Sequence, residues 1–412
     1  MTFIGQVHYT LALSAEKAEN RRDRPMKYNF DEIIPRLNTN SIKYDFPVEM
    51  GKPADVLPLW VADMDFQVPK EVTEKLETIV RHAIYGYSDV KNDYFAAVKS
   101  WFSSGFGFEP EAEWMIKAPG VVFALAQAVQ AFTEPGDAVI IQRPVYKPFS
   151  MVVEQNNRKL VDNPLIYKDG RYTMDLADFE QKVIDNKAKM FIFCSPHNPV
   201  GRVWTEEELR EVAGICLKHK CLMVSDEIHC DFTRPGHTHH ILPALSPEIA
   251  DNCVLCTAPS KTFNLAGLQA SNIFIANDDL RARFQKQFER IGFHCINDLG
   301  AMACKAAYEH GRDWLDQLKV YLEGNLSFLK ESLAEVKGVK VVEPEGTYLV
   351  WLDFTSSGLS PEALKDKIIN KARVWFDEGE KFSPDCGLFQ RVNTACPRAT
   401  LTEALKRVKS VL

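Results

Sequence analysis

Hydrophobic positions between residues 110 and 280 alternate between short apolar runs and stretches with helical periodicity. The apolar side chains of residues 209–217 recur at the i, i+3, i+4, i+7 and i+8 spacing of an amphipathic helix. A second helix is expected at 121–132, directly after a Pro-Gly dipeptide. The runs that predict strands are 114–118, 138–142, 189–194, 221–225, 254–258 and 272–276. Strands that alternate with helices predict βαβ units and a largely parallel sheet with helices on both faces.

The C-terminal part of the chain has a different pattern, which predicts a second, smaller α/β unit. Strands are expected at 339–342, 348–354 and 388–393, and helices at 314–336 and 361–371. A chain of 412 residues is also too long for one ordinary domain. We therefore expect a poorly ordered extension at 1–25, a segment at 26–75 that completes the small domain, a large domain at 76–310 and a C-terminal small domain at 311–412. The extension lacks the basic start of a secretory signal.

Composition excludes several classes of protein. Apolar residues make up 46% and charged residues 25% of the chain, which is typical of globular proteins. The net charge of −7, without a basic block, argues against a nucleic-acid partner. No apolar run reaches the roughly 18 residues of a membrane helix. Most of the 10 cysteines lie in apolar runs, which indicates buried free thiols in a reducing, cytoplasmic compartment.

Two local patterns could suggest a metal site, but neither is convincing. Cys253 and Cys256 have CxxC spacing, yet they lie in a strand-like run without a second pair. The sequence His237-Thr-His-His240 has no carboxylate or cysteine partner at helical spacing, and we interpret it as a polar loop. No metal is expected.

Polar clusters follow four of the predicted strands. They are Ala118-Pro-Gly-Val-Val122, Ser195-Pro-His-Asn-Pro-Val-Gly201, Ser225-Asp-Glu-Ile-His229 and Pro259-Ser-Lys-Thr-Phe-Asn264. Sheets of this kind bind ligands at the carboxyl ends of their strands. The four clusters are therefore the place where we expect the chemistry of this protein.

Each cluster offers a different chemical group. Lys261 could form a Schiff base with an aldehyde, and Asp226 could pair with a protonated ring nitrogen. Asn198 could donate a hydrogen bond to a phenolic oxygen. The helix that begins at Gly120 presents free N–H groups to a phosphate, and Ser260 could add a hydroxyl. One molecule, pyridoxal 5′-phosphate (PLP), carries an aldehyde, a pyridine nitrogen, a phenolic oxygen and a phosphate.

The order of these motifs resembles a known family. SPHNPVGRVW, SDEIH and PSKTFNLAGL look like the class I/II aminotransferase superfamily, the fold-type I PLP-dependent enzymes. The motifs Trp60-Val-Ala-Asp-Met-Asp-Phe66, Tyr85-Gly-Tyr-Ser88 and Arg391-Val-Asn-Thr-Ala-Cys-Pro-Arg398 resemble the MalY/PatB-like cystathionine β-lyase (C–S lyase) branch. The similarity runs from about Met26 to the C-terminus. It implies the α/β fold of PLP-dependent transferases, with a mostly parallel sheet between helices and a smaller α/β domain.

The resemblance also implies a role for each matching residue. Lys261 holds the cofactor and acts as general base, Asp226 pairs with the pyridine nitrogen, and Tyr146 stacks on the ring. Arg391 clamps the substrate carboxylate through a bidentate fork. The cofactor-binding set is Lys261, Asp226, Asn198, Tyr146, Gly120, Val121, Val122, Ser260, His229 and Tyr87. The substrate-binding set is Arg391, Ala62, Asn198 and Tyr87. Because Tyr87 matches a tyrosine that enters the neighbouring subunit's site, the resemblance implies a homodimer with shared active sites.

Three positions depart from related patterns. His229 stands where many aminotransferases have a tyrosine, and Gln269 stands where many have an arginine that faces the phosphate. Both changes look like the lyase branch. Asp377-Glu-Gly379 departs from the branch itself, in which a Pro-Gly turn is usual.

The leading hypothesis is a PLP-dependent C–S β-lyase that cleaves L-cystathionine or a related cysteine S-conjugate to a thiol, pyruvate and ammonia. With cystathionine the thiol is homocysteine, which would place the enzyme in methionine biosynthesis. Two alternatives stay open at this point. The same residues could serve a class I/II aminotransferase, or the protein could be a PLP-binding regulator of the same fold.

Overall fold

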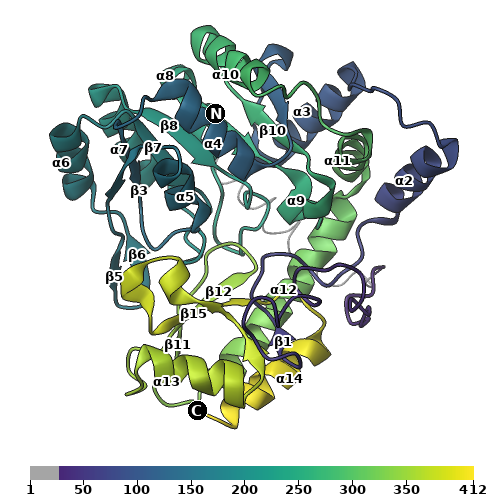
Figure 1. Ribbon diagram of the computed structural model, residues 1–412, viewed down its shortest axis with the longest axis vertical. Coiled ribbons are helices and arrows are strands. Elements are labelled where there is room, and N and C mark those ends of the chain that lie inside the picture. The colour runs from purple at the N-terminus through teal and green to yellow at the C-terminus, as the bar shows by residue number, and fades with distance from the viewer. Residues whose placement is uncertain (1–26) are drawn as a thin grey trace, which may run out of the picture.

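The computed structural model describes residues 27–412, so the extension predicted at 1–25 lies outside the described residues. Helices pack around a seven-stranded sheet and a four-stranded sheet (Figure 1). The helices are α2 (Lys70–His82), α3 (Asn92–Phe106), α4 (Val121–Phe132), α5 (Pro148–Glu154), α6 (Leu176–Asn186), α7 (Glu206–His219), α8 (Pro247–Asp251), α9 (Pro259–Thr262), α10 (Asp278–Arg290), α11 (Asp298–His310), α12 (Arg312–Leu333), α13 (Pro361–Lys365) and α14 (Arg398–Lys409).

A seven-stranded sheet forms the centre of the larger part. Its order is β2 (Met115–Ala118), β10 (Ser271–Phe274), β9 (Cys253–Thr257), β8 (Leu222–Asp226), β7 (Met190–Cys194), β3 (Ala138–Ile141) and β4 (Lys159–Asp162). Strand β10 runs antiparallel to both of its neighbours, and the other pairs are parallel. The predicted mostly parallel sheet is therefore confirmed. Helix α4 has the bounds that the hydrophobic pattern predicts.

Strand β7 shows why helices cover both faces of this sheet. Its five residues are all buried. Met190 and Ile192 pack in the core that includes α4, α5 and α10, whereas Phe191 and Phe193 pack in the core that includes α6 and α7. Successive side chains of a strand point to opposite faces, so a continuous apolar run needs an apolar partner on each side. The sheet consequently opens to a ligand at its strand ends rather than on its faces.

The smaller part contains a four-stranded sheet of β11 (Lys340–Val341), β12 (Leu349–Asp353), β15 (Phe389–Asn393) and β14 (Asp377–Glu378), all antiparallel. Two short pairs complete the strands, β1 (Leu57–Pro58) with β13 (Val374–Trp375) and β5 (Ile166–Lys168) with β6 (Arg171–Thr173). The helix predicted at 361–371 is present as α13 and a following π-helical stretch, Asp366–Lys371.

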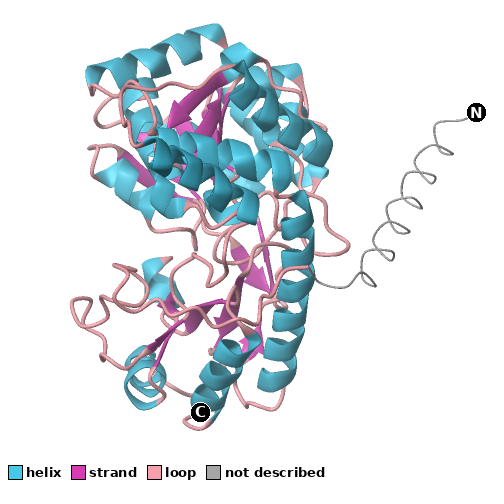
Figure 2. Ribbon diagram, turned by 90° about the vertical axis from the view of Figure 1, so that its right-hand side faces the viewer, coloured by secondary structure: helices cyan, strands magenta, loops and turns pink. Residues whose placement is uncertain are grey.

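The N-terminal segment and the C-terminal region are in contact in the smaller part. Strand β1 pairs in parallel with β13, which lies more than three hundred positions later in the chain. Helix α12 runs alongside both parts of the molecule (Figures 1 and 2). Leu59 packs in the same core as Leu326 and Leu329 of this helix. Leu59 and β1 thus join the C-terminal region, and the domain boundaries stay a prediction.

The cysteine and histidine patterns have structural explanations. All 10 cysteines are free thiols, and Cys253 and Cys256 are both buried in β9. In the histidine-rich loop, His239 is buried and its Nε2 lies 2.7 Å from the Glu227 carboxylate. Within residues 27–412 there is no group of three histidine, cysteine or acidic side chains that could hold a metal ion. In the same range, no helix is long and apolar enough to cross a membrane.

Candidate active site

A cavity of about 200 Å³ lies where the four polar clusters meet. The parallel strands β2, β7, β8 and β9 end at this edge of the sheet, and residues at or just after these four strand ends form part of the wall. Ten lining residues were predicted from the sequence: Ala62, Gly120, Val121, Val122, Tyr146, Asn198, Asp226, His229, Ser260 and Lys261. Residues from positions 62 to 261 are thus gathered around one volume, which is the size of a small organic ligand rather than of a macromolecule.

Lys261 lies on the short helix α9, directly after β9. Its Nζ atom donates a hydrogen bond to the carbonyl oxygen of Ala62 at 2.8 Å. Burial, reinforced by the positive charge of Arg391, lowers the pKa of Lys261 to about 8. At pH 7 roughly a tenth of this amine is therefore uncharged, which is the form that acts as a nucleophile or a base and which is far rarer for an ordinary lysine.

Asp226 is the last residue of β8 and is fully inside the protein. Within the described chain, its carboxylate accepts one hydrogen bond, from the backbone N–H of Ile228 at 3.1 Å. Burial raises the pKa of Asp226 to about 7, and the opposing effects of the Ile228 N–H and of Lys261 are smaller. A buried carboxylate with so few partners is the acceptor that a protonated ring nitrogen requires.

Arg391 contacts Asn198, a residue of the cavity wall. The Nη1 group of Arg391 donates to the side-chain oxygen of Asn198 at 2.9 Å, which leaves the amide hydrogens of Asn198 available as donors. Arg391 lies on β15 and is buried. Its Nη2 group donates to the carbonyl oxygen of Trp60 at 2.7 Å and to the carboxylate of Asp377 at 2.8 Å. The contact with Asp377 was not predicted, because only the register of β14 against β15 places the two residues opposite each other.

Tyr146 and His229 both line the cavity. The backbone N–H of Tyr146 donates to the backbone oxygen of Asn198 at 3.1 Å, which fixes the tyrosine beside that amide. His229 is buried, and burial together with the charges of Lys261 and Arg391 holds its pKa well below the usual 6.5. Its Nδ1 atom has no hydrogen-bond partner within the described residues. His229 is therefore a neutral imidazole in the cavity wall.

The end of the cavity near Gly120 suits an anion. Helix α4 begins at Val121, and no side chain caps its first turn. A Cβ atom added at Gly120 would meet nothing within 4 Å, so the backbone there faces open space. Free N–H groups at a helix N-terminus bind phosphate, and Ser260 lines the same cavity. Gln269, at the position where many relatives in the superfamily have arginine, also lines this cavity.

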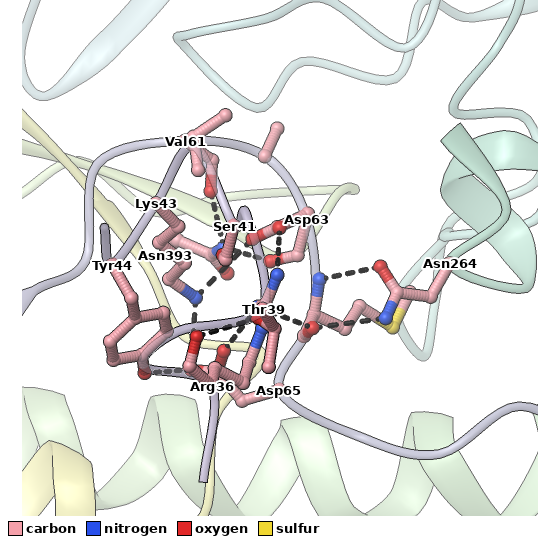
Figure 3. Close-up of polar contacts among 12 residues, drawn as sticks. Arg36, Thr39, Ser41, Lys43, Tyr44, Val61, Asp63, Asp65, Asn264 and Asn393 are labelled. Carbon is pink, nitrogen blue, oxygen red and sulfur yellow. Dashed lines mark hydrogen bonds and ion pairs between the residues drawn. The ribbon is translucent and has the colours of Figure 1, made fainter. Parts of the chain in front are cut away.

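A buried network of charges holds the segment 60–66 in place (Figure 3). Arg36 donates to Asp65 at 2.6 Å and to Asp63 at 2.7 Å, and Lys43 donates to the second oxygen of Asp65 at 2.9 Å. The Tyr44 hydroxyl donates to that same oxygen at 3.0 Å. Because two carboxylates face two cations, the buried charges compensate each other. The motif around Asp63 and Asp65 was noticed in the sequence, but its partners were not.

The same segment is tied to the loop that carries Lys261. The side chain of Asn264 accepts from the backbone N–H of Met64 and donates to the Met64 carbonyl, both at 2.9 Å (Figure 3). The hydroxyl of Tyr348 donates to the Ala62 carbonyl at 3.2 Å. Sequence reasoning missed Tyr348, which no local motif marks. With the segment held in this way, the carbonyl oxygen of Trp60 accepts a hydrogen bond from Arg391, and that of Ala62 accepts one from Lys261.

Two of the predicted site residues do not line the cavity within the described chain: Arg391, which contacts the lining residue Asn198, and Tyr87. Tyr87 lies between α2 and α3 and is fully exposed, at 109% of its reference area. Ile84 and Tyr85 of the same segment are also exposed. An exposed cluster of large apolar side chains is typical of an interaction surface.

The residues present fit PLP. The uncapped start of α4 matches its phosphate, the buried Asp226 matches its ring nitrogen, and Lys261 offers an amine inside the same cavity. The free amide hydrogens of Asn198 match the 3-oxygen. Without such a ligand, the carboxylate of Asp226 would be buried with the N–H of Ile228 as its one hydrogen-bond donor among the described residues.

Comparisons with known proteins agree with this geometry. The profile of the family "Aminotransferase class I and II" matches residues 54–408. The chain belongs to this family. Among its relatives, Cystathionine beta-lyase PatB from Bacillus subtilis is 43% identical over 385 residues, which is 93% of this chain and 100% of that protein. Protein MalY from Escherichia coli is 30% identical over 381 residues, 92% of this chain and 97% of that protein.

A solved structure of the same family extends the likeness to three dimensions. Cystalysin from Treponema denticola, which contains a pyridoxal 5′-phosphate cofactor, matches with a TM-score of 0.90 and 38% identity. The match covers 94% of this chain and 99% of cystalysin. The resemblance to the MalY/PatB branch that the motifs indicated is thereby confirmed, and so is the fold of class I/II aminotransferases.

Proposed function

We propose that this class I/II aminotransferase family member cleaves the C–S bond of L-cystathionine or a related cysteine S-conjugate, and that the cavity around Lys261 is its active site. Cystathionine and water yield homocysteine, pyruvate and ammonia. The chain is a PLP-dependent C–S lyase of the cystathionine β-lyase type, as its full-length relatives are. The observation that carries the assignment to this site is an amine with a lowered pKa facing a buried carboxylate with a raised pKa.

The residues of the cavity divide the work of the reaction. When bound, PLP supplies an electron sink for the electrons of the Cα–H bond. Lys261 would hold the cofactor through its aldehyde, and the free Nζ atom would take the Cα proton of the substrate. Its pKa of about 8 suits a base that works near neutral pH. Asp226 accepts a hydrogen bond from the pyridine nitrogen and stabilises the proton there.

Other side chains orient the reactants. Asn198 would donate to the phenolic oxygen of the cofactor, Tyr146 would hold its ring, and Gly120, Val121, Val122 and Ser260 would hold its phosphate. Arg391 binds the substrate α-carboxylate, and Ala62 lines the place where that substrate lies. His229, as a neutral imidazole, supports the cofactor without competing for its protons. Once the Cα proton is lost, the electron pair expels the thiolate from the β-carbon, and hydrolysis releases pyruvate and ammonia.

The first test measures the products of the purified holoenzyme with L-cystathionine. We expect one pyruvate and one free thiol for each substrate consumed. An aminotransferase would instead convert the bound cofactor stoichiometrically to its amine form with an amino donor alone, and would pass the amino group to a keto acid. Active amino transfer without pyruvate and thiol would therefore contradict the lyase function. A regulatory protein of this fold would show slow turnover with every thioether.

We further infer that the protein is a homodimer in which Tyr87 enters the partner's active site. Its full exposure, beside the exposed Ile84 and Tyr85, supports a contact with a second subunit. Residues 33–50 add further exposed apolar side chains, namely Ile33, Leu37, Ile42, Phe46, Val48 and Met50.

Ten free cysteines, nine of them buried, are in keeping with a cytoplasmic location.

Subunit mixing tests the shared site. Tyr87→Ala and Lys261→Ala should each have low activity as homodimers. After subunit exchange, a mixed dimer has one site with both wild-type residues, so an equimolar mixture should regain about a quarter of wild-type activity. If Tyr87 acted within its own subunit, no activity would return. Sedimentation of the mixture checks that dimers form.

A further inference from the structure

Asp377 contacts Arg391 at the guanidinium that is proposed to bind the substrate carboxylate. The two residues lie directly opposite each other on β14 and β15. Their side chains are 10% and 3% exposed, and Nη2 of Arg391 lies 2.8 Å from Oδ2 of Asp377. The second carboxylate oxygen, Oδ1, accepts from Nζ of Lys381 at 2.8 Å. Asp377 therefore bridges a buried cation and a partly exposed one.

The hydrogens of the Arg391 guanidinium can be counted. Both hydrogens of Nη2 are engaged, one by the carbonyl oxygen of Trp60 and one by Asp377. Nη1 donates one of its two hydrogens to Asn198, and the buried Nε–H has no partner within the described chain. A carboxylate binds arginine in a bidentate way through Nε and Nη2 or through Nη1 and Nη2. Either mode needs a hydrogen of Nη2 that is already in use.

We propose that Asp377 is a positioning residue that occupies Arg391 between turnovers and releases Nη2 when the substrate's α-carboxylate arrives. This inference rests on the proposed role of Arg391 as the substrate clamp. Lys381 makes the release feasible, because it still holds the other oxygen of Asp377 and keeps that carboxylate paired. Asp377 thus competes with every substrate that carries an α-carboxylate. Since it does not touch the bond that breaks, the competition sets KM far more than kcat.

Asp377→Asn removes the competing charge and keeps the size of the side chain. With L-cystathionine, we expect the holoenzyme variant to show a KM roughly fivefold lower than wild type, with kcat changed by less than about twofold. Glu378→Gln is the matched control. Glu378 is the next residue of β14, and it pairs with Lys52 and Lys365 instead of Arg391. The Glu378→Gln variant should have the KM of the wild type, although it removes the same unit of negative charge as Asp377→Asn.

A binding measurement gives a readout that does not depend on turnover. L-Alanine has the α-carboxylate but no group to eliminate, and L-alaninamide lacks the negative charge. Calorimetry should show L-alanine bound roughly fivefold more tightly by Asp377→Asn than by wild type, and L-alaninamide bound equally by both. Lys381→Gln should bind L-alanine more weakly than wild type, since Arg391 is then the one cation left to pair with Asp377.

The outcomes separate the two proposals. Weaker or unchanged L-alanine binding in Asp377→Asn would overturn the role of Asp377, and so would an equal gain for L-alaninamide. If this variant fails to fold, unchanged or tighter L-alanine binding by Lys381→Gln would overturn it as well. Tighter L-alanine binding in a protein that releases no pyruvate from cystathionine would support Asp377 and count against the lyase function alone.

Discussion

Lys261→Ala is expected to abolish the visible absorbance of the bound cofactor and to lower lyase activity by at least about 10⁴-fold. The cause is the loss of Lys261, the one amine among the described residues that line the cavity, which would both attach the cofactor and move the Cα proton. The measurement is an absorbance scan of the PLP-supplied protein, together with pyruvate release from L-cystathionine. The circular dichroism spectrum should stay that of the wild type.

A second variant separates charge from reactivity at this position. Lys261→Arg keeps a positive charge but cannot bind the aldehyde covalently, and it should be as inactive as the alanine variant. Added methylamine should restore part of the activity to Lys261→Ala, since a small amine fits the space that the truncated side chain leaves. A visible band or substantial turnover in Lys261→Ala without added amine would show that the lysine is wrongly assigned.

Asp226→Asn is expected to lower kcat roughly 10³-fold, because a neutral amide does not hold a proton at the pyridine nitrogen. The same change should stabilise the apoprotein above neutral pH. Burial raises the pKa of Asp226 to about 7 in the folded chain, above its ordinary value of 3.8. Between these values the folded state binds the proton more tightly than the unfolded state, so stability falls as the pH rises.

Urea unfolding of the wild-type and Asp226→Asn apoproteins at about pH 5 and about pH 8 checks the prediction on stability. We expect the wild type to lose a few kcal/mol of unfolding free energy between these pH values because of Asp226, and Asp226→Asn to lack this loss. The variant should therefore be the more stable apoprotein at the higher pH while remaining the poorer enzyme. A variant that is less stable there, or one that keeps near-normal kcat, would contradict the role given to this carboxylate.

These two predictions illustrate how function opposes stability in this cavity. A lone carboxylate inside a protein is unfavourable unless a cation faces it. Burial also disfavours the charged form of the Lys261 amine, whose pKa falls to about 8. A bound cofactor would relieve both costs, since its cationic ring nitrogen would face Asp226 and its aldehyde would take up the amine of Lys261, so the apoprotein should be the less stable form.

Much of the site could be predicted from the sequence alone, for a local reason. Hydrophobic runs mark the strands, and each of Asp226, Asn198 and Lys261 lies at or shortly after the end of one of them. Since parallel strands end at one edge of a sheet, position relative to a strand end was enough to bring these residues together. The family motifs then added Ala62, Tyr146 and Arg391, whose roles no spacing reveals.

The sequence by itself determined the βαβ order, the two apolar faces of the sheet and the identity of the groups at its strand ends, because hydrophobic period and chain direction are local properties. Only the tertiary structure decided how far burial shifts the pKa values of Lys261 and Asp226, and which partners Arg391 has. Asp377 and the network around Asp65 belong to that second group. Desolvation and the geometry of charge pairs depend on the whole surroundings of a side chain, and those surroundings come from segments far apart in the sequence.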